Sequence, residues 1–343
     1  MNEPVQLCRR RFLRGVAVVG LSSATALILD GCTSPAPARV PRIGVLTQSS
    51  NPAVLDPFRQ GLRDLGYVPG DSIAIEYRYP RGLGEQVTSE DRTAAMLAEL
   101  VGLNVDLIVT GGAASALAAK KATRAIPIVA VILGEDPVAS GLVSSMARPG
   151  GNLTGFTNSA AGASAKRLEL LTQAIPTTRR VGGMGISSNF GTSISWWKET
   201  QDAAKVLGID LVTVITNGAD DLVRAFDAAR TSGADALVTA PDATLFTNAV
   251  RIAELALQKR MPALFVEREY VDAGGLMNYG PNFAETWRRA AGYVDRILKG
   301  ANPADLPIER PSKFDFVINL KTAAALGLTI PQPVLAQATE VLR

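Results

Sequence analysis

The chain has 343 residues, 47% of them hydrophobic and 20% charged, and a formal net charge of +3. This length exceeds what one hydrophobic core usually organises, so it predicts two domains. The sequence contains no histidine, and its two cysteines, Cys8 and Cys32, both lie near the N-terminus. A Ser-His-Asp or Cys-His catalytic site, a histidine-ligated metal and a disulfide in the body of the chain are therefore excluded.

Residues 1–32 have the pattern of an export signal. A basic segment, RRRFLR, precedes an apolar run from Val16 to Leu29 that is too short for a comfortable membrane span. The basic segment also resembles a twin-arginine signal. Residues 29–32, LDGC, resemble a bacterial lipobox, which would make Cys32 the lipidated first residue of the mature protein, although Asp30 departs from that pattern. The alternative is a retained anchor helix, which would leave the same domains outside the membrane.

Residues 33–41 are small and proline-rich and predict a semi-rigid tether. Residues 1–32 carry four arginines and two acidic residues, so the remaining chain has a net charge of about +1 and no basic run. We therefore expect no nucleic-acid partner.

Strand and helix patterns alternate from Arg42 onward. The first set comprises strands at 42–47, 73–77, 105–110, 127–131 and 153–156, and helices at 52–65, at 93–103, from 113 and at 141–146. The pattern restarts with strands at 180–186, 209–215, 235–239 and 262–266, separated by helices at 196–207, at 222–232 and from 243. Glycines end helices at matched places in the two sets, as at Gly66 and Gly208.

Matched positions indicate that the second set is a diverged copy of the first. Asp106 and Asp235 open strands of similar sequence and lie 129 residues apart, whereas Arg42 and Arg180 lie 138 apart. Such drift fits an old duplication better than a tandem repeat array. The alternation predicts an α/β fold with two doubly wound, Rossmann-like lobes, whose ligand binds beyond the carboxyl ends of parallel strands.

The last third of the chain adds a few further elements. They are a short strand or crossover at 274–279, a helix at 283–298, a loop at 303–311, a strand at 314–318 and a helix at 320–326. We expect the backbone to cross between lobes at 153–157 and at 276–280.

Several blocks of sequence resemble one bacterial family. They are GLRDLGYVPGDSIAIEYR, PIVAVILGEDPVASGLV, RPGGNLTG, AKRLELL, GGLMNYG and INLKTAAALGLTIP, and they occur in order between about residue 41 and residue 334. The chain is similar there to ABC-transporter substrate-binding proteins, a family that includes tryptophan- and tyrosine-uptake receptors. The resemblance implies the type I periplasmic-binding-protein fold, a three-strand hinge and no catalytic activity. It also implies a third crossover near 311–313, with 42–156 and 276–311 in the first lobe and 157–275 and 312–343 in the second.

The turn from Thr110 to Ser115 is the first candidate site. The strand at 105–110 ends there, and Gly111, Gly112 and the N–H groups of Ala113 and Ala114 precede a helix. Free N–H groups at a helix N-terminus bind anions, and the Ser115 hydroxyl would add a donor. The alternative is an ordinary turn whose glycines only permit tight packing. Receptors in the resembling family use the equivalent turn for their ligand.

Other candidates end neighbouring strands. Asp136, Asp242 and Glu267 would pair with a cationic group, although Asp136 and Asp242 are equally suited to capping the helices that follow them. Tyr279 lies near a proposed crossover and would either stack on a ligand or pack in the hinge. The loops that contain Gln48, Ser49, Ser188 and Asn189 would lie at the mouth of the cleft.

The patterns together predict an exported solute receptor in the periplasm or cell envelope, anchored by lipid at Cys32. We expect it to bind a small carboxylate or amino-acid-like solute between its lobes as a monomer, without metal or cofactor, and to deliver that solute to an ABC permease. One alternative is a sensor ectodomain that reports ligand occupancy to a partner protein. The other is a histidine-free enzyme on the same fold, with an acid-only site of Asp136, Asp242 and Glu267.

Overall fold

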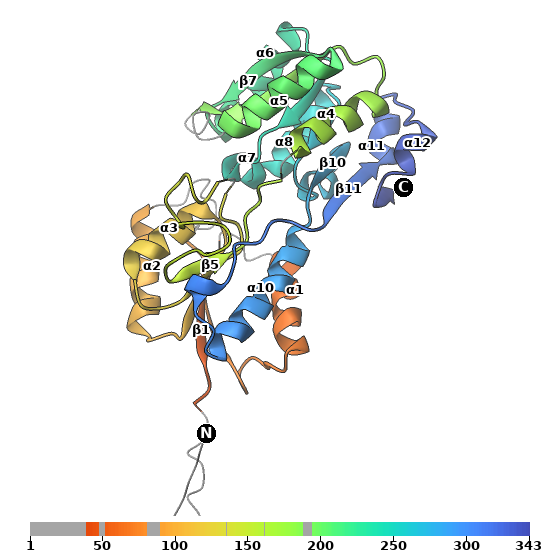
Figure 1. Ribbon diagram of the computed structural model, residues 1–343. Helices are drawn as coiled ribbons and strands as arrows, with labels where there is room; N and C mark the ends of the chain where they lie inside the picture. Colours follow the sequence, from red (N-terminus) through yellow and green to blue (C-terminus); the bar gives the residue numbers. More distant parts are fainter. Residues whose placement is uncertain (1–38, 48–51, 81–89, 135, 161, 188–193) are drawn as a thin grey trace, which may run out of the picture. The chain divides into compact units, whose positions relative to one another are not determined.

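The computed structural model describes residues 39–47, 52–80, 90–134, 136–160, 162–187 and 194–343, without the side chains of 52–54 and 194–195. The export signal and Cys32 lie outside these ranges. Within them, no helix is both long and apolar enough to cross a membrane. Strands and helices alternate as predicted and build two separate sheets (Figure 1).

The first sheet has five parallel strands among the described residues, in the order β2-β1-β3-β4-β5. The strands are β1 (Arg42–Leu46), β2 (Ala74–Arg78), β3 (Leu107–Thr110), β4 (Ile128–Ala130) and β5 (Leu153–Gly155). Every residue of β3, β4 and β5 is buried, as expected for strands covered by helices on both faces.

Helices cover both faces of this sheet (Figure 1). One face packs against α1 (Pro52–Asp64) and α10 (Phe283–Leu298), and the other against α2 (Glu90–Gly102) and α3 (Ala113–Ala122). The helix α10 comes from the C-terminal third of the chain but lies directly against α1. A Cβ at Gly61 would lie 2.6 Å from the Arg288 carbonyl oxygen, so the small residue permits the close helix crossing. The Arg288 guanidinium also pairs with Asp64 at 2.7 Å.

The second sheet has seven described strands in the order β12-β11-β10-β9-β8-β6-β7. These are β6 (Arg180–Ile186), β7 (Asp210–Thr216), β8 (Ala236–Thr239), β9 (Ala263–Phe265), β10 (Met277–Pro281), β11 (Phe314–Asn319) and β12 (Glu340–Leu342). All neighbours are parallel except β10 and β11, which run antiparallel.

The second sheet has its own set of helices. They are α4 (Ala163–Ala174), α5 (Ile194–Leu207), α6 (Leu222–Thr231), α7 (Ala243–Thr247), α8 (Ala249–Gln258), α9 (Glu269–Asp272), α11 (Leu320–Ala325) and α12 (Gln332–Leu335). Two short 3₁₀ turns, η2 (Ala219–Asp221) and η3 (Pro303–Asp305), complete the described elements. Buried side chains from the strands and these helices form one hydrophobic cluster that includes Phe226, Leu264 and Met277.

The two matched aspartates, Asp106 and Asp235, make the same kind of contact in each sheet. The Asp106 carboxylate accepts a hydrogen bond of 2.7 Å from the Arg42 backbone N–H at the start of β1. Likewise, Asp235 accepts hydrogen bonds from the backbone N–H groups of Arg179 and Arg180 at the start of β6, at 2.8 and 2.9 Å. Each aspartate therefore ties the beginning of one strand to the segment that leads into the strand beside it.

Residues 277–281 differ from the expected crossover. We placed 276–311 with the first lobe, but β10 pairs with β9 and β11 inside the seven-stranded sheet. The strand fits there because Gly280 lies so close to the Val266 carbonyl that a Cβ would clash with its oxygen. The chain leaves this sheet at Asn282, whose side chain caps α10 by accepting a hydrogen bond from Glu285 N at 2.7 Å.

The short helix expected at 141–146 is absent from this described segment, which forms turns instead. Gly141 and Gly150 adopt positive φ angles of 70° and 74°, which the helical backbone does not use. The Ser144 N–H donates 2.9 Å to the Pro149 carbonyl and closes a loop rather than a helical turn.

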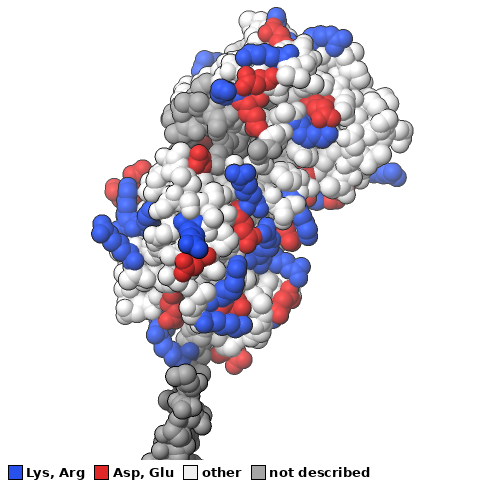
Figure 2. Space-filling view, in the orientation of Figure 1, with Lys and Arg blue, Asp and Glu red and all other residues white. Residues whose placement is uncertain are grey.

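Charges on the face shown in Figure 2 are mixed, with lysine and arginine interspersed with acidic side chains. Elsewhere in the described chain, charged side chains pair at the surface, for example Arg78 with Glu99 and Arg180 with Asp210. Exposed pairs of this kind contribute only about 0–1 kcal/mol each, so the fold depends on its buried clusters instead.

Candidate functional site

The turn that follows β3 separates the roles of its two glycines. The Gly111 N–H donates 2.9 Å to the Leu46 carbonyl, so it is used by the sheet. A Cβ at Gly111 would lie 2.9 Å from Thr47 Oγ1 and 3.1 Å from the Trp287 ring. The packing alternative therefore accounts for Gly111, whose N–H we had expected to be available to an anion.

Gly112 has a different environment. It adopts φ 111° as the N-cap residue of α3, and no side chain caps the helix there. No described atom lies within 4 Å of the position that a Cβ would occupy. The described residues thus leave the positive end of this ten-residue helix without a capping side chain, as an anion site requires. Ala113 begins the helix, and Ser115 is buried in its first turn.

Thr110 and its counterpart Thr239 share an uncommon property. Each is the last residue of its strand, β3 or β8, and each is at most 1% exposed. Neither hydroxyl oxygen finds a hydrogen-bond partner among the described residues. A buried hydroxyl without a partner costs free energy, so these two positions are where a ligand's polar groups would be most useful.

Both candidate aspartates, Asp136 and Asp242, accept hydrogen bonds from the backbone N–H groups that follow them, as capping residues do. Asp136 is exposed, and its Oδ1 accepts hydrogen bonds from the backbone N–H groups of Val138 and Ala139 at 3.1 and 2.9 Å. Asp242 is the N-cap of α7, and its Oδ1 accepts from Thr244 N at 2.7 Å and Leu245 N at 3.1 Å. In each case one carboxylate oxygen is engaged by the backbone, and a role toward a ligand stays a prediction.

Glu267 is the most unusual candidate. It follows β9, it is 6% exposed, and its Oε2 has no hydrogen-bond partner among the described residues. Burial, together with a smaller contribution from the nearby Glu269, raises the pKa of this carboxyl from 4.5 to about 8, whereas the Arg167 guanidinium opposes the shift. Next to it, burial also raises the pKa of Tyr270, whose hydroxyl likewise has no described partner.

Arg167 is a residue that the sequence patterns did not identify. It lies on α4, it is 5% exposed, and its Nε donates 2.7 Å to the Tyr279 carbonyl of β10. The available signal was its position on the stripe of α4 that contains Leu168 and Leu171, because a charged residue is rarely fully buried without a specific role.

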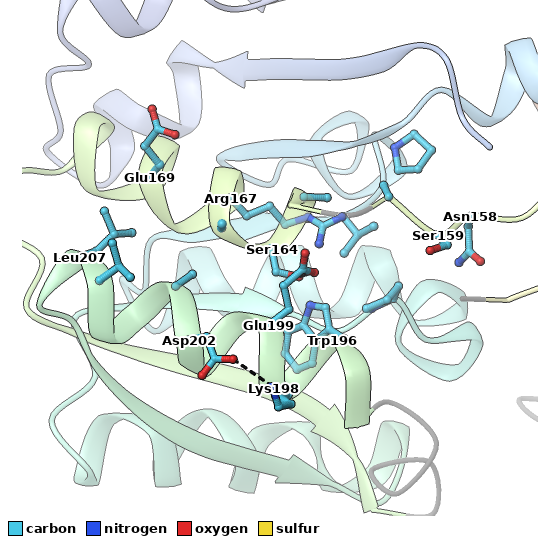
Figure 3. Close-up of a pocket in the computed structure, with 18 of the residues that line it drawn as sticks. Asn158, Ser159, Ser164, Arg167, Glu169, Trp196, Lys198, Glu199, Asp202 and Leu207 are labelled. Atoms are coloured by element: carbon cyan, nitrogen blue, oxygen red, sulfur yellow. Dashed lines mark hydrogen bonds and ion pairs between the residues drawn. The ribbon is translucent and has the colours of Figure 1, made fainter. Parts of the chain in front are cut away.

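A hollow of about 850 Å³ lies between α4, α5, the strand ends and the crossover segments (Figure 3). In Figure 3, Arg167 and Ser164 of α4 face Glu199 of α5, and the Ser164 hydroxyl donates 2.7 Å to Glu199 Oε2. None of the predicted site residues that the structure describes lines this hollow. Pro241 and Val266 do, and each directly precedes a predicted acid, Asp242 or Glu267.

Tyr279 occupies a packed position in β10. Its ring stacks on Phe314 with centroids 5.5 Å apart and meets Phe316 edge-on at 6.4 Å. The packing alternative therefore describes this residue, and contact with a ligand stays a prediction. The loop candidates Gln48, Ser49, Ser188 and Asn189 lie outside the described residues.

Among the residues described, no group of three or more acidic, histidine or cysteine side chains is arranged to hold a metal ion. The polar atoms at the strand ends are carboxyls, hydroxyls and amides. These groups bind solutes by hydrogen bonds and charge.

Residues 42–342 match the family described as ABC transporter substrate binding protein. The chain therefore belongs to this family, whose members bind solutes and are not enzymes. Its fold is that of the type I periplasmic binding proteins.

Individual relatives are consistent with this family. A curated tyrosine-binding protein from Clostridioides difficile (strain R20291) is 25% identical over 277 residues, which cover 79% of this chain and 75% of the relative. A solved ABC domain from Streptococcus pneumonia in complex with L-Trp is 26% identical, with a TM-score of 0.78 over 88% of this chain and 99% of that one. A conserved domain protein from Vibrio cholerae is 27% identical, also with a TM-score of 0.78, over 88% of this chain and 100% of that one.

Proposed function

We propose that this protein is the extracytoplasmic solute-binding component of an ABC importer and that it takes an amino-acid-like ligand between two lobes. One lobe is built on the five-stranded sheet and the other on the seven-stranded sheet. The observation that carries the proposal is the difference between two duplicated turns. The first ends in an uncapped helix N-terminus at Gly112, whereas the second contains Asp242 as the cap of α7, and Glu267 follows the neighbouring strand β9.

The first turn suits a carboxylate. Backbone N–H groups at an uncapped helix N-terminus form charge-assisted hydrogen bonds to an anion, and the helix dipole adds to the attraction. The unpaired hydroxyl of Thr110 lies at the adjoining strand end and would donate to the same group. Because Gly112 has no Cβ, the ligand can approach the backbone closely.

The second turn suits an ammonium group. Asp242 and Glu267 follow neighbouring strands β8 and β9, and the Asp242 charge contributes to the raised pKa of Glu267. Two acids near one buried position favour a cation. A ligand with a carboxylate at one end and an ammonium group close to it is an α-amino acid.

The similarity to a tyrosine-binding protein and to a protein solved with L-Trp supports an aromatic amino acid as the ligand. The hollow beside α4 has apolar walls, which include Trp196, Pro241 and Phe283. Pockets lined in this way accommodate aromatic side chains.

The remaining parts of the proposal concern the cell. Residues 1–32 would direct export, Cys32 would carry the lipid, and 33–41 would tether the receptor near its permease. Closure of the lobes on the three connecting segments would signal occupancy to that permease. A sensor ectodomain is the second candidate, because it would share all of these features except the permease.

Thermal-shift and calorimetric titrations with the twenty L-amino acids test the ligand class. We expect L-tyrosine or L-tryptophan to raise the melting temperature, and we expect tryptamine and indole-3-propionate, which each lack one charged group, to bind far more weakly. Stabilisation by a polyol such as myo-inositol, with no response to any amino acid, would contradict the proposal.

A pair of glycine substitutions tests the anion turn. Gly112→Ala would place a methyl group over the helix N-terminus and weaken binding of the amino acid at least tenfold, which corresponds to about 1.4 kcal/mol. Gly66→Ala is the matched control, because Gly66 has φ 88° and an equally open Cβ position at the end of α1. Both variants should lose some stability, but only Gly112→Ala should lose affinity. Equal affinities of the two variants would place the carboxylate elsewhere.

A further inference from the structure

The backbone that carries Glu267 is held tightly. The Asn278 side-chain amide donates to the Val266 carbonyl at 3.5 Å, and Gly280 packs against the same carbonyl. The Asn278 amide oxygen in turn accepts a hydrogen bond from Val317 N at 3.2 Å. β10 and β11 therefore fix the peptide that joins Val266 to Glu267. The Glu267 side chain extends from this fixed backbone and is buried.

The charges that face Glu267 are mostly negative. Asp242 approaches from the N-cap of α7, and Glu269 from α9, where Tyr270 also contributes its unpaired phenol. Among the described residues, the cation that lowers its pKa is Arg167 of α4, whose Nε donates to the Tyr279 carbonyl.

Two further charges lie near this group. The Asp315 charge on β11 contributes to the raised pKa of Glu269. The next residue in the chain, Arg268, pairs with Asp272 and Glu340 at the surface. Arg167 thus opposes the raised pKa of Glu267, and Arg268 opposes that of Glu269. Glu267 Oε2 still has no hydrogen-bond partner among the described residues.

The cluster also adjoins the hollow beside α4. Arg167 lines that hollow, and so do Pro241 and Val266, the residues that directly precede Asp242 and Glu267. The residue before Asp242 and the residue before the buried Glu267 thus both line the hollow that a ligand would occupy.

We propose that Glu267 is the ammonium subsite of this receptor and that an amino acid binds there in exchange for the proton that the empty receptor holds on the Glu267 carboxyl. On binding, the O–H bond of the carboxylic acid breaks, the proton leaves to solvent, and the carboxylate pairs with the ligand's ammonium group. This inference rests on the proposed function and adds the residue and the proton that accompany binding.

The direction of the pH dependence follows from the same geometry. Because burial and Glu269 raise the pKa of Glu267 to about 8, the empty receptor holds this carboxyl neutral at pH 6 and at pH 7. Only the ionised form pairs with an ammonium group, and its fraction grows about tenfold between these two values. Apparent affinity for the amino acid should rise by that factor and level off above pH 8.

Calorimetric titration of the purified chain with L-tryptophan tests the exchange. The enthalpy is measured at pH 6.5 in two buffers of different ionisation enthalpy, which gives the number of protons released. We expect close to one proton for the natural protein and none for Glu267→Gln, whose affinity should also stay flat from pH 6 to 8. Glu269→Gln is the matched control, because it removes a neighbouring, partly buried carboxyl and leaves Glu267 in place. It should still release most of one proton, although loss of the Glu269 charge lowers the pKa of Glu267 somewhat.

The outcomes separate the two claims. Binding of L-tryptophan without proton release, or an unchanged release from Glu267→Gln, overturns the exchange and leaves the proposed function standing. If none of the twenty amino acids binds, both claims fail together. A ¹³C titration of the glutamate carboxyls in the empty receptor adds an arm that needs no ligand, because a resonance that is missing in Glu267→Gln and titrates below pH 6 also overturns the exchange.

Discussion

Asp242 is suited to two roles, and two substitutions separate them. Its Oδ1 accepts two backbone hydrogen bonds at the start of α7, from Thr244 N at 2.7 Å and from Leu245 N at 3.1 Å. Asp242→Ala removes both acceptors and should lower the free energy of unfolding by about 1 kcal/mol, within the range of about 0.5–2 known for N-caps. Asp242→Asn keeps a side-chain oxygen in place and should lose less than about 0.5 kcal/mol, since asparagine caps nearly as well as aspartate.

Affinity for the amino acid should follow charge rather than capping. If the Asp242 carboxylate attracts the ligand's ammonium group, both variants lose about 1–2 kcal/mol of binding free energy, or roughly 5- to 30-fold in Kd. Urea denaturation measures the first quantity, and calorimetric titration measures the second. Asn319→Ala, which removes the cap of α11, is a control that should lose stability without losing affinity.

Two results would refute this reasoning about Asp242. Equal stability losses in the Asn and Ala variants would show that the cap is not what Asp242 contributes to stability. An Asn variant that binds as tightly as the natural protein would show that the carboxylate acts only as a cap, and the cation would then depend on Glu267 alone.

Three further predictions concern stability and its link to binding. Gly155→Ala should lower the free energy of unfolding by about 3 kcal/mol or more, because Gly155 has φ 138° and a Cβ there would collide with the Ala130 backbone. A circular-dichroism melt like that of the natural protein would contradict this. Thr110→Val should keep or raise stability, because it removes a buried hydroxyl without a described partner, but it should weaken binding of the amino acid at least fivefold, or about 1 kcal/mol. Thr178→Val removes another such hydroxyl and should leave the affinity measured by titration unchanged. As the pH rises from 5 to 7.5, the natural protein should lose about 1.4 kcal/mol of unfolding free energy per pH unit relative to Glu267→Gln. The reason is that Glu267 keeps its proton in the folded chain up to a pKa of about 8 but releases it near 4.5 in the unfolded chain. Urea midpoints that change with pH in the same way for both proteins would contradict this.

Much of the fold could be predicted because its signals are local. Strand ends such as Thr110 and Thr239 were predicted to the residue, and the paired aspartates make matching contacts with the strands beside them. The strand β10 was misplaced because its partners are set by a backbone contact between Gly280 and Val266, which no periodicity reveals. The antiparallel pairing of β10 with β11 also joins segments far apart in the sequence, so local patterns do not reveal it.

The site was harder to predict than the fold because its distinguishing features are tertiary. Gly111 and Gly112 are adjacent and chemically identical, and only the Leu46 carbonyl and the Trp287 ring show that the first is structural. Similarly, the sequence offered Glu267 as one acid among several, and its buried, unpaired oxygen became visible only in the structure.

The two duplicated turns also bear on how a ligand would be oriented. An uncapped helix N-terminus attracts an anion, whereas the Asp242 carboxylate has already neutralised the start of α7 and would repel a second anion there. An amino acid held by both turns would therefore have a single favourable orientation, with its carboxylate at Gly112. In the reversed pose the carboxylate would meet the Asp242 carboxylate, and the ammonium group would meet N–H donors, so both contacts would be repulsive. On the proposed function, the loss of symmetry between the copies is thus what makes the receptor selective for zwitterions.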